Sequence, residues 1–150
     1  MIVLKIMGLK RIGINLLRLK VTKTQSLKKE KMSTFRDLLI WQKSMTLVTE
    51  VYQLTNIFPK EEIYGLTSQI RRSAISIPSN ISEGYGRDGN KDYLKFLNIG
   101  ISSLFEMQTQ LEIAYNLKYI TEIQFNKINE ESKEIERMLS SFIRKIKERI

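Results

Sequence analysis

The chain has 150 residues, 42% of them hydrophobic and 27% charged, and it contains neither cysteine nor histidine. This length and balance indicate one globular domain with a hydrophobic core. Without cysteine there is no disulfide, thiolate zinc site or thiol nucleophile, and without histidine the commonest general base and metal ligand is missing. We therefore expect a protein that is not an enzyme, with no catalytic residue, no bound metal and no cofactor.

The formal net charge of +9 is concentrated in the first 31 residues. This segment carries nine Lys or Arg residues against a single Glu, whereas residues 32–150 carry 16 basic and 15 acidic residues. The rest of the chain is therefore nearly neutral, and the high pI is weak evidence that the folded domain binds nucleic acid.

Residues 1–31 do not have the pattern of a targeting segment. Lys5, Lys10 and Arg11 interrupt the apolar run that a secretory signal or a membrane-spanning helix needs. The cations also scatter around a helical wheel, whereas a membrane-surface helix gathers them on one face. We therefore expect a cytoplasmic protein that has no membrane partner.

Two interpretations of this basic extension remain open: a functional basic tail, or sequence that lies upstream of the native start. Lys28-Lys29-Glu30-Lys31 directly precedes Met32, and the codons of all four residues consist of purines, as in a bacterial ribosome-binding site. We favour Met32 as the native start. The expected division is a basic extension over residues 1–31, disordered or upstream of the start, and a helical bundle over residues 32–150.

From Phe35 onward the hydrophobic residues recur with the period of an α-helix. The first predicted helix runs from Phe35 to about Asn56, because Phe58-Pro59 then disfavours helix. The second begins at Glu61 and Glu62, whose charges suit a helix N-terminus. The predicted core stripe of the first helix is Leu38, Trp41, Met45, Val48 and Tyr52. That of the second is Ile63, Leu66, Ile70, Ser73, Ile77, Asn80 and Gly84.

Two further helices are predicted to follow. The third begins after Asn90, and the fourth opens at Thr121, where Gln124 completes the spacing of a capping box. The third helix has the stripe Leu94, Leu97, Ile101, Leu104, Gln108, Leu111 and Tyr115. The fourth has Phe125, Ile128, Ser132, Ile135, Leu139, Phe142 and Ile146. Short connections make neighbouring helices antiparallel, so the predicted fold is all-α, an up-down-up-down four-helix bundle.

Some hydrophobic residues lie outside these stripes and are candidates for an oligomer interface. Pro78 lies inside the second helix, where it removes one backbone hydrogen bond, and with Ile75 it faces away from the predicted core. The third helix has a second stripe that includes Tyr93, Phe96 and Met107. Two interpretations remain open for this stripe: a wide internal face, or a contact with another subunit.

Residues 84–89 match the dinucleotide-binding pattern G-x-G-x-x-G. That fingerprint requires a strand before it, whereas here a helix precedes it. We therefore expect these glycines to end one helix and lead into the next.

A set of basic residues around the second and third helices is a candidate nucleic-acid interface: Arg71, Arg72, Arg87, Lys91 and Lys95. The alternative is a solvated surface whose cations pair locally with acidic neighbours and add little stability. In a symmetric ring, however, a modest patch would repeat around the axis and produce a stronger field.

The stretch from Tyr64 to Gly84, which includes Arg71-Arg72 and Ile77-Pro78-Ser79-Asn80, is a specific sequence pattern. It resembles the bacterial four-helix-bundle proteins encoded in intervening sequences of 23S ribosomal RNA genes, and the resemblance extends from about Phe35 to Arg144. The resemblance implies a homo-oligomeric ring, commonly a pentamer, related to accessory proteins of retroelements that bind a reverse transcriptase and nucleic acid. It supports Arg71 and Arg72 as contacts with nucleic acid.

The leading functional hypothesis is a non-enzymatic oligomeric adaptor that associates with RNA, DNA or a ribonucleoprotein through a basic rim. The alternative is a protein-only scaffold that binds a partner protein such as a reverse transcriptase. A carboxylate-metal nuclease ranks third, because Glu83, Glu106 and Glu112 lack the spacing of converging metal ligands.

Overall fold

A computed structural model describes residues 34–150, and the predictions made for residues 1–31 lie outside this range. The order of elements is a 3-10 turn η2 (Phe35–Asp37), helix α3 (Leu39–Thr55), a 3-10 turn η3 (Lys60–Glu62), and helices α4 (Leu66–Tyr85), α5 (Asn90–Asn116) and α6 (Glu122–Lys147). Residues 34–150 contain no strand, which confirms the predicted all-α class.

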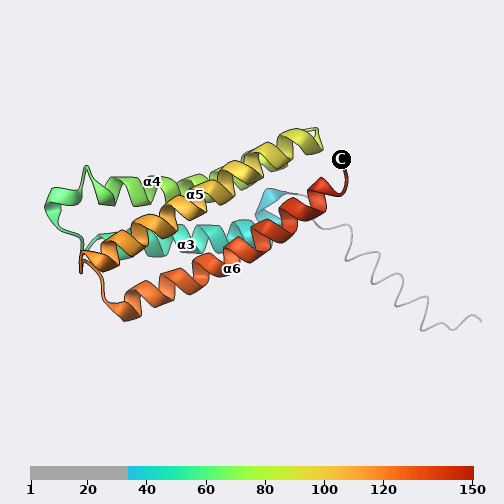
Figure 1. Cartoon of the computed structure of the whole chain (residues 1–150). Coiled ribbons are helices and arrows are strands. Elements are labelled where there is room, and N and C mark those ends of the chain that lie inside the picture. The colour runs from blue at the N-terminus through green and yellow to red at the C-terminus, as the bar shows by residue number, and fades with distance from the viewer. Residues whose placement is uncertain (1–33) are drawn as a thin grey trace, which may run out of the picture. The chain divides into compact units, whose positions relative to one another are not determined.

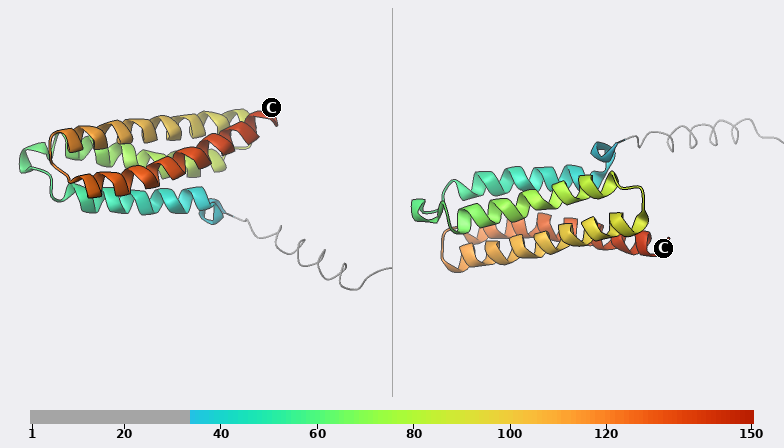
Figure 2. Two further views of the ribbon diagram at one scale, coloured as in Figure 1. Left: turned by 60° about the horizontal axis from the view of Figure 1, so that its bottom comes forward. Right: turned by 90° about the horizontal axis from the view of Figure 1, so that it is seen from above.

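The four long helices form an antiparallel bundle. The ribbon runs along α3, returns along α4, and repeats this path along α5 and α6 (Figures 1 and 2). In the described part of the chain, α3 packs against α4 and α6, and α5 packs against the same two helices. Helices α3 and α5 are therefore diagonal in the bundle, as are α4 and α6. None of the described helices is long and apolar enough to cross a membrane.

The helix termini follow the local chemistry of the sequence. Thr121 and Gln124 form the predicted reciprocal capping box at the start of α6. The backbone amide of Gln124 donates a 3.3 Å hydrogen bond to the Thr121 hydroxyl oxygen. The second helix begins at Leu66, four residues later than Glu62. Glu62 nevertheless acts on its N-terminus, because its Oε2 accepts a 2.8 Å hydrogen bond from the Leu66 amide.

The predicted stripes of α4, α5 and α6 contribute many of the residues of the bundle core. Ile70 and Ile77 of α4, Leu104 of α5, and Ile135 and Leu139 of α6 are all essentially inaccessible to solvent. These residues lie at the spacing of one helical face, so their burial follows from the period of the sequence. The predicted stripes therefore contain most of the buried hydrophobic residues of these three helices, but they miss Ala74, Ile81, Met107, Ala114 and Ile143.

The predicted core stripe of the first helix is correct at Leu38, which is buried, but wrong within α3. The residues of α3 that face the core are Ile40, Ser44, Leu47, Val51 and Leu54. In contrast, Met45 is 41% exposed and Tyr52 is 38% exposed, and Trp41 and Val48 are only partly buried. The two stripes differ by one residue, which is a rotation of about 100° on a helix. Helix α3 therefore has two adjacent apolar stripes. One enters the core, and the other lies at the surface beside α4.

The glycine-rich segment connects α4 to α5, as expected. Gly86 caps the end of α4 and Gly89 precedes α5. Gly84 lies within the last turn of α4, where a Cβ atom would be 2.7 Å from Tyr93 Cδ2 and 3.0 Å from Phe96 Cβ. A side chain at this position would therefore separate the two helices, whereas glycine lets them approach.

Candidate interaction surfaces

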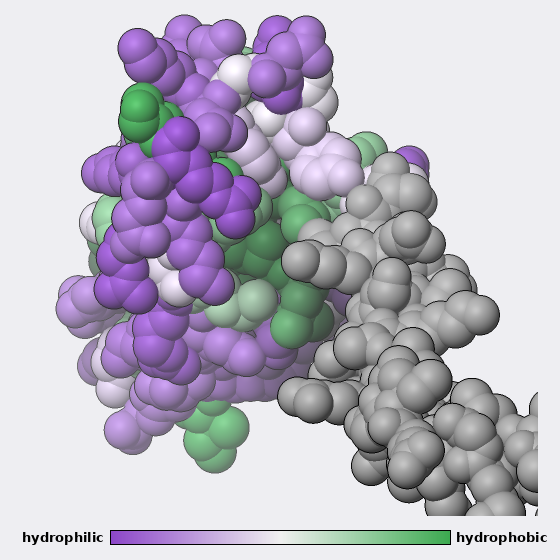
Figure 3. Space-filling model, turned by 90° about the vertical axis from the view of Figure 1, so that its right-hand side faces the viewer, coloured by the Kyte–Doolittle hydropathy of each residue, from purple (hydrophilic) through white to green (hydrophobic). Residues whose placement is uncertain are grey.

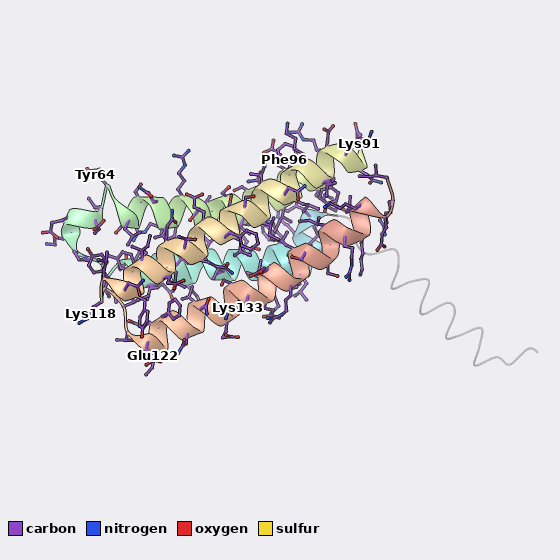
Figure 4. All side chains as sticks on the ribbon, viewed as in Figure 1. Tyr64, Lys91, Phe96, Lys118, Glu122 and Lys133 are labelled. Atoms are coloured by element: carbon purple, nitrogen blue, oxygen red, sulfur yellow. The ribbon has the colours of Figure 1, made fainter. Side chains whose placement is uncertain are left out.

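The five candidate nucleic-acid residues do not form one cluster. Arg71 and Arg87 are 16 positions apart along and just beyond α4, which corresponds to ~24 Å at the rise of an α-helix. Lys91 lies at the opposite end of the bundle from Tyr64 and Lys118 (Figure 4). Arg71 and Arg72 thus belong to the first half of α4, and Arg87, Lys91 and Lys95 belong to the end where α5 begins.

Arg71 stabilises the junction between α3 and α4. Its Nε donates a 2.8 Å hydrogen bond to Thr55 Oγ1, and its Nη2 donates a 3.1 Å hydrogen bond to Asn56 Oδ1. The guanidinium group also lies 4.6 Å from the centre of the Tyr52 ring. These contacts place a positive charge at the C-terminus of α3, where the helix dipole favours it. The half-buried Arg71 is therefore a structural residue, and its guanidinium group is not free for the expected contact with nucleic acid.

Arg72 is exposed and has a different environment. It borders two surface hollows, one shared with Tyr52 and Ile75 and one shared with Ser76 and Glu106. Among the described residues, no hydrogen bond or ion pair of its guanidinium group is found. Of the two adjacent arginines, Arg72 is the one available to a partner.

Arg87 is partly neutralised by its neighbours. Its Nη2 lies 2.6 Å from Glu83 Oε1, and its guanidinium group lies 4.6 Å from the centre of the Phe96 ring. Lys91 and Lys95 are exposed in the first and second turns of α5. Only these two residues of the predicted rim extend freely into solvent at this end of the bundle.

The cations at the end of α6 lie beside the start of α5. Asn90 Nδ2 donates a 3.4 Å hydrogen bond to the Arg149 carbonyl oxygen. We name the resulting surface the cationic end; its basic residues are Arg87, Lys91, Lys95, Arg144, Lys145, Lys147 and Arg149. Its acidic residues are Glu83, Asp88, Asp92 and Glu148. Figure 3 looks onto this end and shows hydrophilic side chains gathered around a smaller hydrophobic area.

An apolar groove runs along the seam between α3 and α4. It consists of two adjoining hollows of about 340 Å³ each, which share Ile75. The first is lined by Phe35, Arg36, Trp41, Met45, Val48, Ile75, Pro78, Ser79 and Ser82. The second is lined by Tyr52, Ile63, Thr67, Ser68, Arg71, Arg72 and Ile75. We name this surface the α3–α4 groove. The misassigned stripe of α3 forms one wall, and the outward residues of α4 form the other.

The exposed face of α5 is a second apolar surface. Ile99, Phe105 and Ile113 are 40%, 45% and 42% exposed, and Glu106 and Glu112 are exposed on the same helix. We name these five residues the α5 ridge. No Lys or Arg occurs between Lys95 and Lys118, so the ridge is both apolar and acidic.

The remaining interface candidates on α5 belong to the interior of the bundle. Met107 is completely buried, and the Tyr93 ring packs edge-on against Phe142 at 5.5 Å. Tyr93 and Phe96 also close over Gly84. The second stripe of this helix is therefore an internal face, and its residues have little surface to offer a second subunit. Ile75 is the candidate that remains exposed, at 42%, and Pro78 is buried beneath the groove that it helps to line.

The seam between α3 and α6 contains a charged cluster. Lys127 Nζ lies 2.9 Å from Glu50 Oε2, and Lys43 Nζ lies 3.0 Å from Glu134 Oε1. Burial, followed by a hydrogen bond with Glu50, raises the pKa of Glu131 to about 7. Burial also acts to raise the pKa of Glu50, but hydrogen bonds with Glu131 and Lys127 outweigh it and lower that pKa. Near pH 7 the two carboxylates thus share a proton.

A polar cleft of about 510 Å³ lies between α4 and α5. Ser73 Oγ lies 2.7 Å from Gln110 Oε1, and Ser76 Oγ lies 2.8 Å from Ser103 Oγ. The Ser103 hydroxyl donates to the Ile99 carbonyl oxygen, so Ser76 must donate to Ser103. These hydroxyl hydrogens are already engaged in hydrogen bonds. The serines therefore fit a role in helix–helix packing better than a role as a nucleophile. Within residues 34–150, no three acidic side chains gather closely enough to hold a metal ion.

Comparison with known proteins gives two matches. Residues 36–141 match the family described as 23S rRNA-intervening sequence protein. The chain is also similar to a crystal structure from Bacteroides thetaiotaomicron, a protein with unknown function from the S23 ribosomal protein family. The two sequences are 30% identical, the TM-score is 0.66, and the match covers 71% of this chain and 96% of that one. Among curated proteins, none matches the chain.

Proposed function

This chain belongs to the 23S rRNA-intervening sequence protein family, and from that premise we propose that it acts as a non-catalytic adaptor that assembles with copies of itself. The observation that carries the proposal is the α3–α4 groove. A single bundle leaves Met45, Tyr52 and Ile75 each about two-fifths exposed in two adjoining hollows, the first mainly apolar and the second of mixed character. Apolar surfaces of this kind mark sites of protein association.

Light scattering of the full chain at micromolar concentration tests the assembly. The expected result is a discrete oligomer, with a ring of five copies as the stoichiometry that the family resemblance favours. Ile75→Asp places a charge in the middle of the groove and should shift the protein to a monomer. Ile123→Asp is the matched control, because Ile123 is 83% exposed at the start of α6 and lies outside the groove. A monomeric wild-type protein would contradict the proposal.

The cationic end favours nucleic acid as the partner of the assembled adaptor. Seven cations and four carboxylates lie in the last turn of α4, its connection to α5, the start of α5 and the end of α6, whereas residues 32–150 as a whole carry only one excess positive charge. In a symmetric assembly this excess positive charge would repeat around the axis. Phosphate groups would bind to the repeated charge with a strong dependence on salt. Lys91 and Lys95 are its most accessible members on α5.

A charge-matched pair of variants tests the nucleic-acid partner in the full chain. Lys91→Glu/Lys95→Glu should weaken the binding of short RNA or DNA duplexes and reduce the slope of log affinity against log salt by about one to two units. Lys60→Glu/Lys118→Glu changes the net charge equally at the opposite end of the bundle. Because residues 1–31 are identical in both variants, their +8 charge contributes equally. Equal binding by both variants would instead support a protein-only scaffold, the remaining alternative.

A further inference from the structure

We infer that the α3–α4 groove of one copy receives the α5 ridge of the next copy, an inference that rests on the proposed self-assembly. The first argument is the charge of the groove. Arg36 lies at one end of it, Arg71 and Arg72 line the other, and no acidic residue is among the described residues that line it. A complementary surface must therefore be apolar in the middle and negatively charged around it.

The α5 ridge has this composition. Ile99, Phe105 and Ile113 supply apolar side chains along a single helix, and Glu106 and Glu112 supply the negative charge. A helix that lies in an apolar groove is a common mode of protein recognition, in which the exposed apolar residues of the helix enter the groove. The ridge is therefore an occupant that every copy of the chain already carries.

The arrangement of the helices makes the two surfaces complementary between copies. The groove lies on the α3 side of the bundle, and the ridge lies on α5, the helix diagonal to α3. One copy cannot fill its own groove with its own ridge. A groove-to-ridge contact is consequently heterologous, and repetition of it closes into a ring if the rotation between copies allows it.

Charge also argues against the main alternative, in which two grooves face each other across a two-fold axis. Such a contact would bring Arg36, Arg71 and Arg72 of one copy against the same three residues of its partner. Like charges brought together in an interface disfavour it. The ridge instead offers the Glu112 carboxylate to the same arginines, whereas Glu106 already borders a hollow with Arg72 of its own chain.

A mixing experiment with two full-length variants tests the pairing. Ile75→Asp blocks the groove and leaves the ridge intact, whereas Phe105→Asp blocks the ridge and leaves the groove intact. Both positions are more than two-fifths exposed, so the bundle should tolerate either change. Each variant alone should be a monomer. An equimolar mixture should form a 1:1 complex and stop there, because only one groove and one ridge remain usable.

Other outcomes separate this inference from the proposed function. If Phe105→Asp stays oligomeric while Ile75→Asp becomes a monomer, the groove mediates assembly but the ridge does not occupy it. If both variants stay oligomeric, the groove is not the interface at all. If both are monomers that do not associate on mixing, the pairing is wrong.

A charge exchange provides a second test that leaves the apolar residues unchanged. Arg72→Glu in the groove and Glu112→Lys on the ridge should each raise the dissociation constant of the oligomer about tenfold. The two changes in one chain should restore assembly in large part, since the groove then carries the negative charge and the ridge the positive one. Simple addition of the two losses would overturn the inference. Circular dichroism of each variant confirms that the bundle remains folded.

Discussion

Gly84 lies where α4 meets the first turns of α5, and the surrounding aromatic rings leave no room for a methyl group. The Tyr93 ring on one side of this contact also packs against Phe142, so it has little freedom to move away. Gly100, in contrast, has ordinary van der Waals space, with a Cβ at 3.6 Å from Asn80 Cβ. We therefore expect substitutions at these two buried helical glycines to have opposite effects on stability.

We predict that Gly84→Ala destabilises the bundle by about 1–3 kcal/mol through overpacking. Gly100→Ala is the control and should be neutral or stabilising by up to about 1 kcal/mol, because alanine favours the helix interior more than glycine does. The midpoint of urea unfolding measures both changes. Equal effects of the two substitutions would show that helix propensity, and not the contact with Tyr93, determines the role of Gly84.

Glu131 gives a prediction about pH. Its pKa is raised to about 7 in the folded protein, from an ordinary value of 4.5, so the folded state binds a proton more tightly than the unfolded state. The contribution of Glu131 to stability is therefore present at low pH and is lost as the pH rises from about 4.5 through about 7. Glu50 has the opposite sign, because its lowered pKa stabilises the folded state above its ordinary range and this is lost in acid.

Glu131→Gln should remove the loss of stability between pH 5 and pH 8, because glutamine has no proton to lose in this range. The thermal unfolding temperature measured across this range should become flatter than in the wild-type protein. Glu130→Gln, at the exposed neighbouring position, should leave the wild-type pH profile unchanged. A wild-type profile that rises steadily from pH 5 to pH 8 would contradict the shared proton.

At the scale of helices, the sequence predicted the class of residues 34–150, the number and the order of their long helices, and most of the buried hydrophobic residues of α4, α5 and α6. The stripe of α6 is correct because its opposite face is strongly polar, which leaves only one apolar orientation. Helix α3 has two adjacent apolar stripes, and periodicity cannot show which one faces the other helices. The stripe that was predicted to face the core is apolar for another reason: it forms a wall of the α3–α4 groove.

Arg71 and Arg72 illustrate the same limit for the candidate site. Neighbouring residues on a helix point about 100° apart, so only one of them can reach the end of α3. The sequence pattern treats the two alike. In contrast, the separation of Arg71 from Arg87 could have been predicted from the helical rise, and the proximity of α6 to the start of α5 from the antiparallel order. Those two facts would have separated Arg71 and Arg72 from the other three residues of the predicted rim.

Arg71→Met should destabilise the bundle by about 1.5–3 kcal/mol, because hydrogen bonds of a charged donor to Thr55 and Asn56 are lost. Arg72→Met, at the exposed neighbouring position, should change the free energy of unfolding by no more than about 0.5 kcal/mol. Chemical denaturation of the two variants at low protein concentration checks this difference and limits the influence of assembly. Similar losses from both substitutions would remove the structural role that distinguishes Arg71.

At the scale of the whole molecule, residues 34–150 form a four-helix bundle that has its own hydrophobic core. We therefore predict that a chain of residues 32–150 retains the helicity and the melting temperature of the full chain to within about 2 °C, a small change for a domain of this size. Circular dichroism measures both quantities. A large loss of stability on truncation would show that residues 1–31 contribute to the folded state.

The order of the helices in space also bears on how the bundle forms and opens. Three of the four seams join helices that are consecutive in the chain, whereas the seam of α3 with α6 joins the first long helix to the last. Closing it carries the largest loop entropy, so it should form late in folding and open early in unfolding. Contacts made after the transition state act mainly on the unfolding rate. The Glu50–Glu131 pair lies in this late seam, and its protonation should therefore control how long the closed bundle persists more than how quickly it forms.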